Sequence, residues 1–285
     1  MTKALAGNPS LADVDPSSTL GNIPAPNLTH LGANGWTDTN IVNALKKGID
    51  KNGQGLFPIM PYRVWANMAD VDAEAVAKYI LSLDVIEPDT PTRQPLGMLS
   101  QLHLPVPVID PSTIPDPVFS AGTSAADETA AEHGKYLAAE GGPCIDCHTS
   151  EKQDLTFDAS KFFAGGQTFD IGGPFGVVTS LNITQAQNGI HGWTAADVGK
   201  VLTDGVDNMN TPLCPPMPVG PQGAFGGLKP ADVNAIAQYI IRLPPIENPT
   251  DGGMIMMCVP PGPPMDGGPD AMASMDGSLD AAKTD

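Results

Sequence analysis

The alternation of apolar and polar positions predicts a mainly helical chain. One helix is expected over 125–140, where Ser124 is a suitable N-cap, acidic side chains occupy the first turn, and Gly141 follows the last periodic position. Another is expected over 230–242, with proline in its first turn and Tyr239 on its inward face. We therefore expect an all-α fold in which long loops join a few helices.

Two shorter helices are predicted by matching start and stop signals. Thr37 and Thr194 are N-cap residues, and each is followed by a polar and apolar pattern that ends at a glycine, Gly48 or Gly205. The loops between helices are expected to be long, because Gly (31) and Pro (30) exceed ordinary globular usage in these 285 residues. The length suffices for two small domains.

The charge balance limits the partners. Asp and Glu number 32 against 14 Lys and Arg, so the net charge of −18 argues against nucleic acid and anionic membrane surfaces and favours a protein with a basic patch. No apolar run approaches the about 20 residues of a membrane span, the longest conspicuous one being Met254–Val259. The opening residues also lack the pattern of a signal peptide.

Cys144, Cys147 and His148 form a Cys-x-x-Cys-His motif, the pattern of covalent haem attachment. Two thiols three positions apart can form thioethers with the two vinyl groups on one edge of a porphyrin. The adjacent histidine then supplies a nitrogen ligand to the iron. The motif therefore predicts a haem c.

Two other readings of the motif are less favoured. A redox dithiol needs no following histidine and usually comes after a strand in a βαβ unit, which this sequence does not indicate. A zinc site needs a second ligand pair at compact spacing, whereas the other cysteines, Cys214 and Cys258, lie far apart. Those two cysteines can instead form a disulfide in an exported protein, with free buried thiols as the alternative.

The helix over 125–140 followed at once by the haem motif resembles class I cytochrome c. This resemblance implies that the helix crosses the C-terminal one at 230–242, with Gly134 permitting close approach and Tyr136 packing beside it. It also implies a methionine as second axial ligand, presented by a proline-rich loop ahead of the last helix.

Met217 fits this role, because prolines on both sides stiffen its loop. The alternative for Met217 is a core residue that fills a gap, which is the commonest role of methionine. Met209, eight residues earlier in a polar stretch, is the nearest rival ligand, and His191 and His133 are less suited.

An internal repeat places Met60 in register with Met217. The matching segments are Pro26–Thr29 with Leu181–Thr184, Gly35–Thr37 with Gly192–Thr194, Gly48–Asp50 with Gly205–Asp207, Pro58–Pro61 with Pro215–Pro218, Ala77–Ile80 with Ala237–Ile240, and Ile86–Glu87 with Ile246–Glu247. So many matches in one order indicate a duplication. Met60 is therefore expected to be the axial ligand of a first haem.

The first copy has no cysteine motif of its own. In the register of the second copy, that motif would fall before Met1, on the side where a signal peptide is also missing. Either the sequence begins too late, or the first copy is degenerate and binds no haem. The retained proline loop around Met60 favours the first explanation. One haem is then expected in this chain, and a second if the missing segment is restored.

The repeat and the composition divide the chain into four parts. We expect a partial cytochrome c-like domain over 1–87, a semi-rigid proline-rich connector over 88–122, and a complete cytochrome c domain over 123–248. The last part, 249–285, is acidic, rich in Met, Gly and Pro, and expected to be disordered.

The segments over about 20–87 and 124–248 resemble cytochrome subunits of membrane-bound alcohol or sugar-acid dehydrogenases. The resemblance implies a periplasmic or otherwise exported carrier of single electrons, not itself an enzyme. Haem contacts are expected from Asn182 and Trp193; Trp193 and Trp36 either bind haem propionates or pack as walls. A dihaem peroxidase-like enzyme and a haem-based redox or gas sensor remain alternatives.

Overall fold

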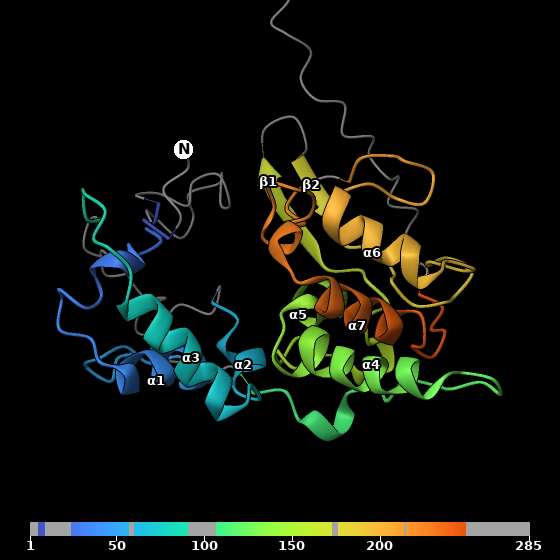
Figure 1. Ribbon diagram of the computed structural model, residues 1–285, viewed down its shortest axis with the longest axis horizontal. Coiled ribbons are helices and arrows are strands. Elements are labelled where there is room, and N and C mark those ends of the chain that lie inside the picture. The colour runs from blue at the N-terminus through green and yellow to red at the C-terminus, as the bar shows by residue number, and fades with distance from the viewer. Residues whose placement is uncertain are drawn as a thin grey trace, which may run out of the picture.

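The protein was analysed as a computed structural model, which describes residues 5–8, 24–56, 60–90, 107–172, 176–213 and 215–248. Helices account for most of its regular structure, as the sequence predicted (Figure 1). The α-helices are α1 (Asp38–Lys47), α2 (Tyr62–Trp65), α3 (Asp70–Leu81), α4 (Ala125–Lys135), α5 (Cys144–His148), α6 (Ala195–Asp204) and α7 (Pro230–Ile240). Shorter helical turns are η1 (Leu28–His30), η2 (Pro111–Thr113), η3 (Tyr136–Glu140), η4 (Ala159–Lys161) and η5 (Ala224–Gly227), of which η3 is π-helical. We call the described residues 24–90 the first half, 107–122 the described part of the connector, and 123–248 the second half.

The expected all-α fold needs one correction. Strands β1 (Thr168–Gly172) and β2 (Gly176–Thr179) form an antiparallel hairpin, with Phe169 opposite Val178 and an irregularity between Asp170 and Gly172. The hairpin contains β-branched and aromatic residues, which favour strands, but it is too short to give a clear alternating pattern.

The capping residues lie where the sequence predicted them. Thr37 and Thr194 both form capping boxes at the starts of α1 and α6, and Gly48 and Gly205 end these helices in the left-handed conformation. Ser124 caps α4 by accepting a hydrogen bond from the backbone N–H of Asp127. The helix predicted over 125–140 continues beyond α4 as the π-helical turn η3, and α7 ends two residues earlier than predicted.

Helices α4 and α7 cross in contact, as the resemblance implied (Figure 1). A Cβ atom on Gly134 would lie 1.9 Å from the carbonyl oxygen of Ala235, so only glycine permits this backbone approach. Tyr239 is completely buried beside the crossing, and its hydroxyl donates a hydrogen bond to the carbonyl of Pro115. The hydroxyl of Tyr136, just after α4, donates a hydrogen bond to Asp72 at the start of α3, and its packing beside the crossing stays a prediction.

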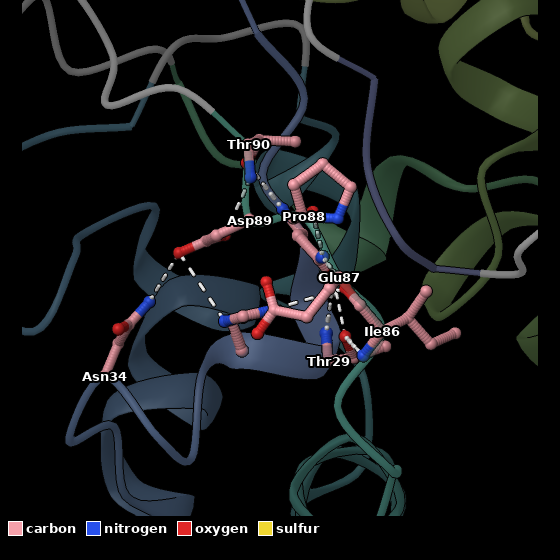
Figure 2. Close-up of polar contacts among 9 residues, drawn as sticks. Thr29, Asn34, Ile86, Glu87, Pro88, Asp89 and Thr90 are labelled. Carbon is pink, nitrogen blue, oxygen red and sulfur yellow. Dashed lines mark hydrogen bonds and ion pairs between the residues drawn. The ribbon is translucent and has the colours of Figure 1, made fainter.

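In each half, the same set of hydrogen bonds joins the last segment to an early turn. In the first half, Asn27 Oδ1 accepts from the backbone N–H and hydroxyl of Thr29, and the Thr29 hydroxyl accepts from the N–H of Ile86 (Figure 2). The same three bonds recur in the second half with Asn182, Thr184 and Ile246. Asn182 also donates from Nδ2 to the carbonyl of Ile246, as Asn27 does to that of Ile86.

The halves differ in what covers their last helix. Tyr239 on α7 is fully buried, whereas Tyr79, at the matching position of α3, is 59% exposed. Helix α4 lies across α7, but no helix among the described residues crosses α3 in the same way. The first half therefore has a smaller core, centred on Ile41, Leu45 and Ile80.

The larger core, in the second half, also includes residues that precede it. Val64 of α2 is completely buried in this cluster, together with Ile109 and Ile114 from the segment between the halves. The described part of the connector is thus packed against the second half. None of the helices in the described residues is long and apolar enough to cross a membrane.

The helix crossing predicts opposite effects of two glycine substitutions. Gly134→Ala should lower the free energy of unfolding by about 1–3 kcal/mol, because the added methyl group meets a backbone carbonyl that cannot move alone. Gly199→Ala, inside α6, places its Cβ atom 3.4 Å from a Val233 methyl group and should be neutral or stabilising by up to about 1 kcal/mol. Urea unfolding followed by circular dichroism measures both; equal effects would contradict a close crossing at Gly134.

Candidate haem-binding site

The cysteine motif forms the short helix α5, whose position is fixed on both sides. Gly142, just before α5, lies so close to η3 that an added Cβ atom would be 1.6 Å from the carbonyl oxygen of Leu137. Ile145, between the two cysteines, is completely buried in the core of the second half. Residues three and four positions apart share one helix face, so the thiols of Cys144 and Cys147 and the ring of His148 are brought together.

His148 is oriented by a backbone carbonyl. Its Nδ1 lies 2.8 Å from the carbonyl oxygen of Leu181, and because a carbonyl only accepts, Nδ1 carries the proton. Nε2 is then unprotonated and has no hydrogen-bond partner among the described residues. Burial lowers the pKa of His148, which keeps the ring neutral. A neutral imidazole with an oriented, free Nε2 is the form that binds iron.

The two thiols are poor candidates for a redox dithiol. Burial raises the pKa of Cys144 to about 12, with a further contribution from Cys147. Burial, together with the neighbouring Asp146, raises the pKa of Cys147 to about 11. Reactive dithiols have lowered pKa values instead, so these thiols stay protonated near neutral pH. Within the described ranges, no cluster of three or more His, Cys, Asp or Glu side chains is arranged to hold a metal ion.

Asn182 positions the loop that carries the Leu181 carbonyl. It is 2% exposed, and all of its polar atoms are occupied: Oδ1 by Thr184, and Nδ2 by the Ile246 carbonyl and the side chain of Asn188. The next residue is also fixed, since the N–H of Ile183 donates to the carbonyl of Phe163. Asn182 thus acts on His148 through the backbone; its predicted contact with the cofactor stays a prediction.

Met217 lies against the same apolar cluster as the motif. Both Met217 and Cys144 are partly buried and pack on the core of the second half. The other partly buried apolar residues on this cluster include Phe157, Ile183, Trp193, Phe225 and Leu228. The rival Met209 is 72% exposed, so the structure separates the two methionines by their surroundings.

The remaining candidate histidines lie on the surface. The ring of His191 is bonded to the carbonyl of Gln185 and the side chain of Gln187, and His133 lies beside Asp232. Both are exposed, which agrees with their low rank as ligands. Cys214 and Cys258 lie outside the described residues, so their predicted disulfide stays a prediction.

Met60 has surroundings like those of Met217. It is partly buried and packs on the core of the first half, with Trp36 beside the same cluster. The carbonyl of Met60 accepts a hydrogen bond from the N–H of Tyr62, just as that of Met217 accepts one from Val219. The backbone just after each methionine is therefore closed by the same hydrogen bond.

Sequence reasoning missed two contacts of the motif. The Leu181 carbonyl heads a repeated segment, and that repetition was the available signal for it. Asp146, between the two cysteines, is paired with Arg63 from the first half, and no local pattern connects these residues. Burial raises the pKa of Asp146, and the Arg63 guanidinium opposes this shift.

The donor set fits a covalently attached haem. It consists of two protonated thiols and a neutral, oriented imidazole on one short helix, with a thioether on the same apolar cluster. Thiols can bond to the porphyrin edge, while nitrogen and sulfur can bind the iron from its two sides. Large apolar side chains around them suit a porphyrin face.

Asn182→Ala is expected to lower the free energy of unfolding by about 1–3 kcal/mol, because it removes the acceptor of the buried Thr184 N–H and a donor to the Ile246 carbonyl. The control is Asn188→Ala, which removes only an exposed partner of Asn182 and should cost at most about 0.5 kcal/mol. Urea unfolding of the full chain compares them. Similar small losses in both variants would mean that Asn182 does not hold the loop.

Comparisons with known proteins identify several relatives that are named cytochromes. No protein-family model matches the chain. The chain is 29% identical to the fructose dehydrogenase cytochrome subunit of Gluconobacter japonicus, over 80% of this chain and 46% of that protein. It is 27% identical to the cytochrome c subunit of the alcohol dehydrogenase (quinone) of Gluconobacter oxydans, over 85% and 51%.

A diheme cytochrome c-type protein of Cereibacter sphaeroides is 26% identical, over 81% of this chain and 75% of that protein. The chain thus spans about half the length of the dehydrogenase cytochrome subunits that it matches. The names of these relatives agree with the haem that the cysteine motif predicts. They confirm that this chain resembles the c-type cytochromes, and in particular the cytochrome c subunits of dehydrogenases.

Proposed function

We propose that the chain is an electron-transfer protein that carries one covalently bound c-type haem in its second half. Cys144 and Cys147 attach the haem, and His148 and Met217 are its axial ligands. The observation that supports this most strongly is the orientation of His148, whose Nδ1 donates to the Leu181 carbonyl while Nε2 is unprotonated and has no partner in the described part of the chain. When bound, the haem supplies an iron that accepts and releases one electron.

The residues of this chain have separate tasks in this proposal. The Leu181 carbonyl fixes the ring plane of His148 and raises its basicity as a ligand. The proline loop presents Met217 with little loss of conformational entropy, because its backbone is already restricted. Trp193 and the apolar side chains near it exclude water, which with thioether ligation favours the reduced form.

The wider assignment rests on the relatives. Two of them are named as cytochrome subunits of dehydrogenases, which supports a role as an electron-transfer subunit, and not as the catalytic one. The chain would pass electrons between exported or membrane-bound redox proteins. The excess of acidic residues favours a partner with a basic docking surface.

The two halves are proposed to derive from a duplicated cytochrome c domain, with boundaries near 1–87 and 123–248. The shared Asn-Thr hydrogen bonds, capping boxes and turns at Met60 and Met217 support this. Met60 is then the axial ligand of a first haem, whose cysteine motif does not occur in these 285 residues.

The haem assignment predicts one covalent adduct. The full chain matured with a c-type cytochrome assembly system should carry a single haem, located by mass spectrometry on the peptide that contains Cys144 and Cys147. Cys144→Ser with Cys147→Ser should abolish attachment, because thioether bonds need the sulfur atoms. Free thiols in the matured wild-type protein would overturn the proposal.

Met217→Ala is expected to remove the sulfur-to-iron charge-transfer band and lower the reduction potential, because thioether ligation raises the potential. Met209→Ala is the matched control, and its exposed side chain should leave both properties unchanged. Carbon monoxide should bind the reduced Met217→Ala protein and not the wild type. Binding to the wild type would favour the sensor or peroxidase-like alternatives.

A further inference from the structure

Arg63 is a buried cation that belongs to the first half but is bonded to the second. It lies on α2, three residues after Met60, and is 7% exposed. Figure 1 shows α2 on the side of the first half that faces α5. Its backbone carbonyl accepts from the N–H of Ile109, so the main chain is held as well.

The Arg63 guanidinium contacts four residues of the second half. Nε and Nη2 both donate to Asp146 Oδ1, at 3.1 and 2.9 Å, and Nη2 also donates to Glu151. Nη1 donates to the Leu155 carbonyl at 3.1 Å. The carbon at the centre of the guanidinium lies 4.1 Å from the centroid of the Phe157 ring, a cation–π contact.

These partners connect Arg63 to the haem motif and to the loop that follows it. Asp146 lies between the two cysteines on α5, and Glu151 pairs with Phe157 across a short loop that follows the motif. Phe157 in turn packs on the apolar cluster that Cys144 and Met217 also contact. A planar guanidinium can satisfy all of these groups at once, whereas a lysine ammonium cannot.

The geometry points to Arg63 as a positioning residue for the haem site: the first half holds the cysteine motif of the second in place and sets the charge beside it. This inference rests on the proposed haem attachment. Without Arg63, two largely buried carboxylates would remain next to the motif without a cation. Negative charge near an iron favours its oxidised form, so the reduction potential responds to this residue.

The test measures the reduction potential of the haem-loaded full chain by spectroelectrochemistry. Arg63→Gln should lower the midpoint potential while the charge-transfer band of the methionine ligand is retained. Arg63→Lys keeps the charge but loses the fork of donors, and should restore part of the shift. The matched control is Lys46→Gln. Lys46 donates to Asp70 and to the carbonyl of Met68, both within the first half, so the midpoint potential of this variant should equal that of the wild type.

A double-mutant cycle separates positioning from general stability. In the Asp146→Asn background, Arg63→Gln should shift the potential less than in the wild type, because its main partner is already neutral. An equal shift in both backgrounds, or no difference between Arg63→Gln and Lys46→Gln, would overturn the inference. If Arg63→Gln does not fold, Arg63→Lys alone tests the inference. A wild-type midpoint potential in Arg63→Lys would then overturn the positioning role.

Failure of the haem assignment can be distinguished from failure of the inference about Arg63. If the wild-type chain carries no covalent haem, the proposed function is wrong, and hydrogen exchange of the haem-free chain tests Arg63. The amides of Lys152 and Leu155, which are bonded within the loop after the motif, should exchange faster in Arg63→Gln than in Lys46→Gln. Equal exchange rates would overturn the positioning role.

Discussion

The structure depends on the close crossing of α4 and α7 at Gly134. Because the Gly134 backbone contacts the Ala235 carbonyl region directly, the two helices enclose Tyr239, and the π-helical turn after α4 leads straight into α5. The position of the cysteine motif is thus set by a contact between helices that are about a hundred residues apart. A side chain at Gly134 would separate them and shift the motif with them.

Loops in this protein are ordered by specific hydrogen bonds in place of regular secondary structure. Asn182 is the central residue in the second half, since it ties the turn at Thr184 to the segment at Ile246 and thereby fixes the carbonyl that orients His148. In the first half Asn27 likewise joins the turn at Thr29 to the segment at Ile86, and Asp89 on that segment accepts a hydrogen bond from Asn34 (Figure 2). A buried amide that satisfies several backbone groups can stabilise a loop that has few apolar residues.

The two halves are similar in local structure but differ in what they bury. Helix α7 is covered by α4, whereas α3 exposes Tyr79, so the apolar cluster of the first half is the smaller one. Val64 and Arg63 of the first half are instead buried against the second half. The contact between the halves is therefore mixed, with an apolar residue in the core and a cation paired to Asp146 and Glu151.

The sequence by itself determined the local features of this protein. Caps at Thr37 and Thr194 and the cysteine motif each depend on residue type and short spacing, which are readable along the chain. The crossing at Gly134 was expected only from the resemblance to class I cytochrome c.

Only the tertiary structure decided the rest: the exposure of Met209, the carbonyl that orients His148, the hairpin over 168–179, and the pairing of Arg63 with Asp146. These depend on contacts between residues far apart in sequence. No local preference encodes which carboxylate a buried arginine will meet.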